Sequence, residues 1–368
     1  MILLSLGNLG DLLIQAAFLR RLNRAGVSVA VPSSYASIAA ELFPEAAVIP
    51  LTDRWSDGRW LMSARLDRTA TVTYLLGELG ARYPGRPIKS LSLTDELIHE
   101  RALNIYAAYW RLLQQDPVLA DAVAPTAYPS APSYWVPFDH LPRWSGTAGP
   151  RTVYLCPWGG FGLKTIPADD VQRLYDASRR LGCSVRLLVS PRDDANQYRY
   201  FRAEEIVRLS ADRIVHDAAT HLSRATLVVA VDTAWYHLAA MIGAPVMGVP
   251  GPRSLGHFEF PGAKRARSPS ERRLCADCFS VDRCVVTNDT RCDARPDAPT
   301  LVAALEANLS GSSFVPPQRP PARAVPPAPF RRAAWRLAFH GISAMRTVAS
   351  QPALRGPSRR LLRLFVPR

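Results

Sequence analysis

Short apolar runs alternate with segments of helical periodicity in two separate stretches of the chain. In the first stretch, strands are expected at residues 2–6, 27–31 and 46–51, and helices at 11–23 and 35–42. In the second, strands are expected at 153–156, 184–189, 227–231 and 244–249, and helices at 168–181 and around 237–242. Strands that alternate with helices are typical of parallel sheets. The pattern therefore predicts an α/β protein with two parallel-sheet halves, and the helical periodicity of residues 90–116 adds a longer helix to the first.

A change of composition separates these halves and sets off the C-terminal end. Residues 122–150 contain six prolines, which is typical of an interdomain connection. We expect an N-terminal Rossmann-like domain over residues 1–140, its connection continuing to about 150, and a second domain over 151–310. Seven prolines between 312 and 329 predict that residues 311–368 form a tail outside both domains.

The positive charge is concentrated in this tail. The chain has 45 basic and 31 acidic side chains, and its net charge is +14. Residues 311–368 hold 11 arginines and no acid, so the first 310 residues carry 34 basic and 31 acidic side chains, a net charge of +3. A nearly neutral folded part argues against a nucleic-acid-binding core, which usually carries a basic face.

The arginines of the tail are interspersed with apolar residues. Such a pattern over 330–348 and 359–368 indicates contact with an anionic membrane surface, the alternative being a solvated tail. The N-terminus lacks the basic start of an export signal, and the chain has no apolar run of about 18 residues. We therefore expect a cytoplasmic protein, held peripherally at the inner face of the membrane.

The loop 7–11 lies between the first strand and the first helix. It lacks the third glycine of the dinucleotide-binding fingerprint, which argues against an NAD-dependent dehydrogenase. Gly7, Asn8 and Gly10 offer close backbone approach, and Asp11 adds a carboxylate at a helix start. Such a carboxylate is suited to take a proton from a substrate hydroxyl, the alternative being a simple helix cap.

The loop 156–165 occupies the equivalent position in the second half. Its three glycines, Gly160 among them, expose backbone N–H groups, and Lys164 is one of only three lysines in the chain. A point charge beside such a loop suits phosphate oxygens, although the spacing is not that of a Walker A motif. The alternative is an ordinary surface lysine.

The segment 227–252 is read as strand, polar loop, helix and strand. Asp232 and Thr233 stand at the loop, where they suit the cap of a helix whose N–H groups face outward. A helix start at the carboxyl ends of parallel strands can bind a diphosphate, the alternative being a capped helix with no ligand. His237 lies one turn further on.

Four cysteines are clustered near the end of the second half. Cys275, Cys278, Cys284 and Cys292 could hold a structural Zn²⁺ or iron ion if they are reduced. The spacings are irregular for a zinc ribbon, so plain thiols or a labile disulfide remain alternatives. Cys156 and Cys183 are expected to be buried as small hydrophobic residues.

Together these segments resemble glycosyltransferase family 9, the heptosyltransferases that build the lipopolysaccharide inner core. The family's L-G-x-x-G-D matches residues 6–11, and its K-x-W-P is represented by residues 164–167. Its signature D-[ST]-G-x-x-H-L-A-x-A-x-G-x-P resembles residues 232–245, and the cysteine segment also has counterparts in the family. The resemblance spans about residues 1–309, with Ala234 in place of the family glycine and Ile166 in place of the tryptophan.

The resemblance implies a GT-B fold, in which two Rossmann-like domains face each other across a cleft. It implies a nucleotide-sugar donor on the second domain, held by these residues: Gly160, Lys164, Asp232, Thr233, Ala234 and His237. Asp11 would be the general base of an inverting transfer that requires no cofactor.

The substrates that the resemblance implies are ADP-heptose as the donor and a lipid-linked lipopolysaccharide core or related glycan as the acceptor. The alternatives are another nucleotide sugar or acceptor, or a catalytically inactive nucleotide-binding scaffold at the membrane.

Overall fold

The structure is a computed structural model of the 368-residue chain. It describes residues 2–4, 9–19, 28–44, 46–51, 53–56, 59–62, 72–74, 89–90, 104–114, 138, 140–146, 149–160, 162–252, 255–260, 291–292 and 295–311. The predicted basic tail lies outside these residues except for Gly311.

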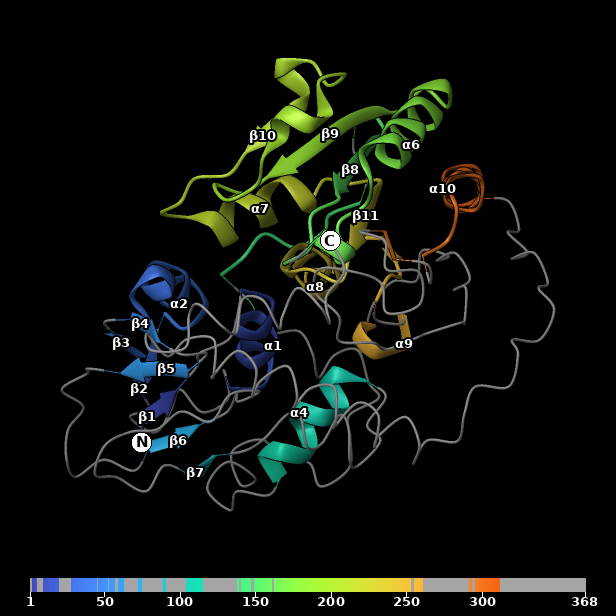
Figure 1. The fold of residues 1–368 in the computed structure, drawn as a ribbon. Helices are drawn as coiled ribbons and strands as arrows, with labels where there is room; N and C mark the ends of the chain where they lie inside the picture. Colours follow the sequence, from blue (N-terminus) through green and yellow to red (C-terminus); the bar gives the residue numbers. More distant parts are fainter. Residues whose placement is uncertain are drawn as a thin grey trace, which may run out of the picture.

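The first half is built on a five-stranded parallel sheet (Figure 1). Its strand order is β3 (Ala47–Leu51), β2 (Ser28–Pro32), β1 (Ile2–Leu4), β6 (Val72–Tyr74) and β7 (Lys89–Ser90). The helices that follow the first two strands are α1 (Leu9–Leu19) and α2 (Ala36–Leu42), and β4 (Asp53–Ser56) pairs antiparallel with β5 (Arg59–Met62). The prediction of a parallel α/β half is confirmed.

The prediction of a long helix over residues 90–116 is wrong about where that helix starts. Lys89–Ser90 is an edge strand paired with β6, and the described helix is α4, Ile105–Gln114. Hydrophobic periodicity locates an element better than its ends, because a two-residue edge strand carries too few positions to show a period.

The second half repeats the arrangement. Its strand order is β10 (Ile206–Arg208), β9 (Ser184–Val189), β8 (Thr152–Cys156), β11 (Leu227–Val231) and β12 (Val246–Val249), all parallel. Its longer helices are α6 (Ala168–Arg180), α7 (Ile214–Leu222), α8 (Ala234–Met241) and α10 (Ala298–Ser310), and α9 (Leu255–Phe258) is a single turn. β10, α7 and α10 are additional to the elements expected from the sequence.

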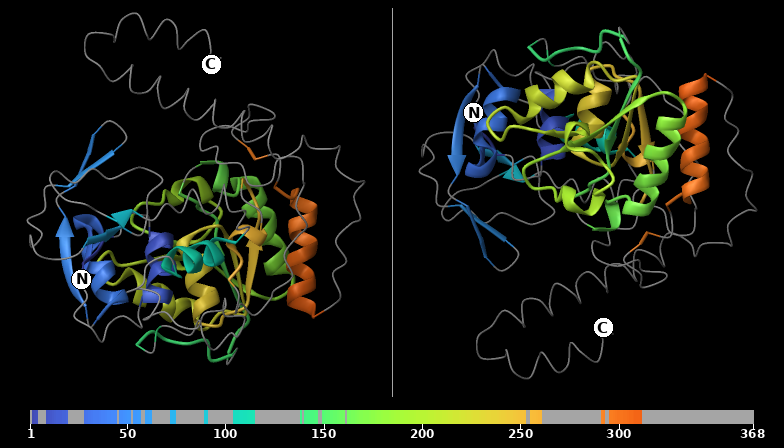
Figure 2. Two further views of the ribbon diagram at one scale, coloured as in Figure 1. Left: turned by 90° about the horizontal axis from the view of Figure 1, so that it is seen from below. Right: turned by 90° about the horizontal axis from the view of Figure 1, so that it is seen from above.

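Helix α10 has clear boundary signals in the sequence that explain where it begins and ends. The Asp297 carboxylate accepts the main-chain N–H of Thr300 at 3.1 Å, and a proline lies in the first turn. Gly311 ends the helix in the left-handed conformation, with φ at 71°. The helix packs along α6 at one side of the second sheet (Figure 2).

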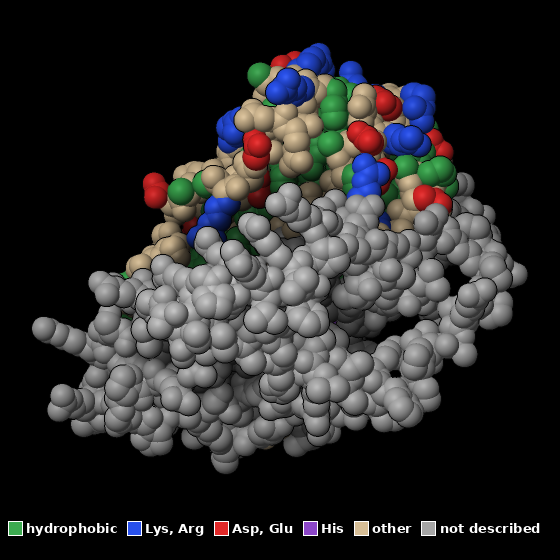
Figure 3. Space-filling model, viewed as in Figure 1, with side chains coloured by type: hydrophobic (Ala, Val, Ile, Leu, Met, Phe, Trp, Pro, Cys, Tyr) green, Lys and Arg blue, Asp and Glu red, His purple; other side chains and the backbone are tan. Residues whose placement is uncertain are grey.

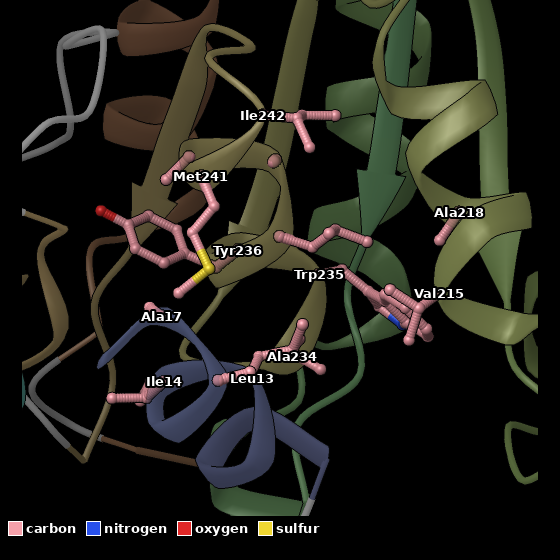
Figure 4. Close-up of a cluster of buried hydrophobic side chains, with 14 of the residues drawn as sticks. Leu13, Ile14, Ala17, Val215, Ala218, Ala234, Trp235, Tyr236, Met241 and Ile242 are labelled. Carbon is pink, nitrogen blue, oxygen red and sulfur yellow. The ribbon is translucent and has the colours of Figure 1, made fainter. Parts of the chain in front are cut away.

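Helix α8 lies between the two halves and is buried on every side. All eight of its residues are buried, and all five residues of the preceding strand β11 are buried as well. Leu13, Ile14 and Ala17 of α1 approach α8 from the first half, while Trp235 reaches toward α7 on the other side (Figure 4). One hydrophobic core therefore runs from the first half into the second.

The surface of the second half carries both signs of charge. On the face seen in Figure 3, arginine side chains are interspersed with aspartate and glutamate over α6, β9 and β10. Mixed charge on this face agrees with the near-neutral balance of the first 310 residues.

Polar contacts also join the halves. The Glu41 carboxylate of α2 accepts the main-chain N–H of His216, in the first turn of α7, at 2.9 Å. Arg192 lies 5.1 Å from the ring centre of Tyr35 and donates to its hydroxyl at 3.0 Å. Burial raises the pKa of Glu41 above its ordinary value of 4.5, against the opposing effect of the hydrogen bonds from His216 and Val215.

Replacement of Glu41 by glutamine should favour the variant over the parent at neutral pH more than at acid pH. A carboxyl whose pKa is raised on folding stabilises the fold fully below its unfolded pKa, and this contribution is lost as pH rises through the folded pKa. Glutamine does not titrate, so the Tm of Glu41→Gln relative to the parent should be more favourable at pH 7 than at pH 4. Thermal unfolding at both pH values measures this, with the exposed Glu204→Gln as control. A difference in Tm that stays flat or falls between those pH values contradicts the interpretation.

Candidate active site

An ion pair marks the carboxyl ends of two neighbouring strands in the second half. Lys164 ends a short 3₁₀ turn that follows β8, and Asp232 directly follows β11. The Lys164 Nζ lies 2.5 Å from Asp232 Oδ2, and each side chain is only 13% exposed. Because β8 and β11 are paired in parallel, their following loops meet at one edge of the sheet. Lys164 is therefore a largely buried, ion-paired side chain and not an ordinary surface lysine.

His237 connects this pair to the first half of the chain. Its Nε2 lies 3.6 Å from Asp232 Oδ1, and its Nδ1 lies 2.6 Å from the hydroxyl of Tyr106 in α4. The His237 side chain is 3% exposed. A continuous chain of polar contacts thus runs from Tyr106 through His237 and Asp232 to Lys164.

Sequence analysis missed Tyr106. Its ring packs edge-on against Phe260, 5.2 Å between centres, and against the His237 ring at 5.6 Å. Tyr106 is buried in α4 like its neighbours Ile105 and Tyr109, so in the helical pattern it looks like any core residue. A helical pattern cannot distinguish a core tyrosine from one whose hydroxyl meets a distant histidine.

The first turns of α1 and α8 lie against each other. A Cβ added to Gly10 would lie 3.6 Å from the Ala234 nitrogen and 3.7 Å from His237 Cδ2. Helix α1 begins at Leu9, two residues before the expected start, so Asp11 belongs to its first turn rather than to the cap. The structure therefore brings the Gly10–Asp11 segment to the start of α8, while Gly7 and Asn8 lie outside the described residues.

The start of α8 is not closed by a side-chain cap. Thr233 occupies the cap position, but its hydroxyl makes no capping hydrogen bond, which corrects the expectation of a side-chain cap. Its carbonyl accepts the N–H groups of Tyr236 and His237. Among the described residues, the N–H groups of Ala234 and Trp235 have no backbone acceptor. Together with the dipole of the helix, these groups favour an anion.

The loop 157–165 requires a glycine at position 159. A Cβ at Gly159 would lie 2.1 Å from the Cβ of Lys164, closer than two carbon atoms can approach. Gly160 is exposed, with open space where its Cβ would be. A glycine is therefore needed at position 159, where the main chain passes close to the Lys164 side chain. Gly160 can contact a ligand only through its backbone.

The cysteines are only partly described. Cys156 and Cys183 are buried, as predicted, and burial raises the pKa of both thiols. Cys292 is buried, whereas Cys275, Cys278 and Cys284 lie outside the described residues. Within the part of the chain that the structure covers, no three potential ligands are grouped for a metal ion. The metal site stays a prediction.

Fold and geometry together define a two-sheet α/β protein whose anion-attracting helix start lies where its halves meet. Residues 124–286 match the model of glycosyltransferase family 9 (heptosyltransferase), the family that the sequence motifs resemble. No curated protein matched the chain by sequence.

Solved structures agree on the fold. The E. coli ADP-heptose lps heptosyltransferase II is 15% identical, with 84% of this chain and 99% of that one covered at a TM-score of 0.52. The glycosyl transferase family 9 protein from Veillonella parvula is 13% identical, with 84% and 97% covered at a TM-score of 0.54. At such identities the likeness is one of fold, and the predicted GT-B arrangement is confirmed.

The Tyr106 hydroxyl should contribute measurably to stability. Tyr106→Phe leaves a buried histidine nitrogen without its partner, which costs about 1–3 kcal/mol of unfolding free energy. Urea denaturation of the variant and the parent measures the difference. Tyr35→Phe, which removes a hydroxyl bonded to the exposed Arg192, is the control and should cost less. Equal losses in the two variants would count against a special role for the Tyr106–His237 bond.

Proposed function

We propose that the chain is an inverting glycosyltransferase that moves heptose from ADP-heptose to a lipopolysaccharide core or a related glycan. The observation that carries this proposal is the Lys164–Asp232–His237 cluster at the start of α8, opposite Gly10 and Asp11 of the other half. One side of this junction is suited to an anionic donor, and the other brings a carboxylate.

The donor diphosphate is assigned to the start of α8. The N–H groups of Ala234 and Trp235 and the Lys164 ammonium supply positive charge to phosphate oxygens there. The Thr233 hydroxyl, which makes no capping bond, lies at the same helix start, and the exposed Gly160 offers its backbone N–H from the loop after β8. His237 is proposed to hold the Asp232 carboxylate against Lys164.

Asp11 is proposed as the base for the acceptor. Its carboxylate takes the proton of the acceptor hydroxyl while that oxygen attacks the anomeric carbon of the sugar. The bond from that carbon to the diphosphate oxygen breaks, and the nucleoside diphosphate leaves with the electron pair. A single displacement of this kind inverts the anomeric carbon. The charge that develops on the leaving group is stabilised by Lys164 and the α8 start.

The comparisons support a heptose donor. The matched family is described as heptosyltransferase, and the E. coli protein of the same fold is named for ADP-heptose. Ala234 stands where the family resemblance has glycine, directly at the proposed phosphate site, so another nucleotide sugar is the alternative donor. An inactive nucleotide-binding scaffold is the alternative from outside the class of enzymes.

The Asp11 carboxylate is tested by its amide. Asp11→Asn should lower turnover of ADP-heptose by about 10²–10⁴-fold, because general-base catalysis contributes about that much. Binding of ADP, measured by calorimetry, should remain near that of the parent. Asp169→Asn is a matched control, since Asp169 is an exposed aspartate in the first turn of α6.

Unchanged turnover in Asp11→Asn would remove its role as base. A parent protein that binds ADP but turns over no nucleotide sugar would instead favour the scaffold.

We further propose that the basic tail holds the enzyme near a lipid-linked acceptor. The 11 arginines and the absence of acids in residues 311–368 support this proposal, since such segments are attracted to anionic lipid surfaces. Among the described helices, none has both the length and the apolar character to cross a bilayer.

Removal of the residues after Ser310 should abolish sedimentation with vesicles that contain anionic phosphatidylglycerol. The full chain should bind such vesicles, and should bind less at high salt because the attraction is electrostatic. Vesicles of neutral phosphatidylcholine are the control. Equal sedimentation of the full and shortened chains with anionic vesicles would refute membrane contact by the tail.

A further inference from the structure

A buried arginine holds the loop that carries Lys164. Arg295 is 6% exposed and belongs to the segment that leads into α10. Its Nη1 donates to the carbonyl of Thr165 at 2.5 Å, and its Nη2 donates to the carbonyl of Leu163 at 2.7 Å. The two acceptors are the residues on either side of Lys164. One guanidinium therefore fixes the main chain immediately before and after the lysine.

The loop depends on such a fastening because its composition makes it flexible. Three glycines precede Lys164, and glycine loses more backbone freedom on ordering than any other residue. The loop's own bonds join Thr165 to Gly159 and Gly162. Two parallel donors in the rigid plane of a guanidinium fit a pair of carbonyls better than a single ammonium does.

Arg295 is itself held in place from several sides. Its main-chain N–H donates to the Cys292 carbonyl at 3.2 Å, and Asp297, two residues on, caps α10. A Cβ at Gly251 would lie only 3.3 Å from the Arg295 Nη2, so the glycine two residues after β12 leaves room for the guanidinium. The loops after β8 and β12 and the lead into α10 thus meet at this side chain.

The positive charge of Arg295 is costly where it lies. Burial lowers the pKa of Arg295 to about 10, while Cys292 and Asp170 act in the opposite direction, and the side chain remains protonated at neutral pH. A buried charge whose hydrogen bonds go to carbonyls is less favourable than a well-packed apolar side chain of similar size. Its two hydrogen bonds to the lysine loop offset part of that cost.

We infer that Arg295 is the positioning residue of Lys164, and that it sets the affinity of the site for a nucleoside diphosphate by fixing the 163–165 backbone. This inference rests on the proposed function, because it takes Lys164 as a ligand of the donor diphosphate. Arg295 acts through the loop and touches no reacting atom.

A double-mutant cycle on the full-length protein tests the inference, with ADP as the probe in calorimetry. Arg295→Lys keeps the charge but loses the paired donors, and it should raise the Kd for ADP by about tenfold. Arg295→Met should raise the Kd for ADP more than Arg295→Lys does. Lys164→Met should raise the Kd at least as much as Arg295→Met. In the Lys164→Met background, Arg295→Lys should have little further effect, because the group that it positions is gone. Arg180→Met removes an exposed arginine of α6 and is the matched control.

The outcomes separate the inference from the proposed function. If Lys164→Met weakens ADP binding but a folded Arg295→Lys leaves the Kd unchanged, the positioning role is overturned and the donor site stands. Additive losses in the double variant also overturn it, since Arg295 would then act independently of Lys164. If Lys164→Met leaves ADP binding unchanged, the proposed donor site itself is overturned, and the inference with it.

Discussion

The burial of α8 on all sides is the constraint on which the rest of the structure depends. A helix with no polar face cannot be covered by its own sheet alone, so it needs neighbours on its remaining sides. Helix α7 covers one side, and α1 of the first half covers another through Leu13, Ile14 and Ala17. The same packing that completes the core therefore holds the two halves together. It also fixes the start of α8 at their junction, next to Gly10.

Charged groups at this junction are largely removed from water, so each depends on its partners. The Lys164 Nζ and the Asp232 Oδ2 form an ion pair at 2.5 Å, and the Arg295 guanidinium donates hydrogen bonds to two carbonyls. Tyr106 supplies the hydroxyl that meets His237 Nδ1. Loss of one member of such a network costs more than its own bond, because the group left behind is buried without a partner. Tyr106 and Arg295 therefore help to hold His237 and the Lys164 loop in place.

The sequence allowed prediction of the two parallel sheets and of the segments that carry Asp11, Lys164 and Asp232. These features are local: a buried strand followed by a polar loop and a helix start is visible within about ten residues. Contacts between distant segments could not be predicted in this way. Tyr106 and His237 are 131 positions apart, and Arg295 lies 132 positions from Leu163. Gly159 was present in the glycine-rich loop, but only the placement of the Lys164 side chain distinguishes it from Gly160.

The Lys164–Asp232 pair stabilises the site that is proposed to bind the donor diphosphate. An unpaired lysine at 13% exposure would be destabilising, and the carboxylate offsets that cost. In the proposed donor complex the ammonium is shared with phosphate oxygens, because a lysine presents three donors around one charge. Asp232 keeps a second contact there, since the His237 ring lies 3.6 Å from its other oxygen. That ring meets the Tyr106 hydroxyl of the first half, so the same histidine connects the proposed donor site with the contact between the halves.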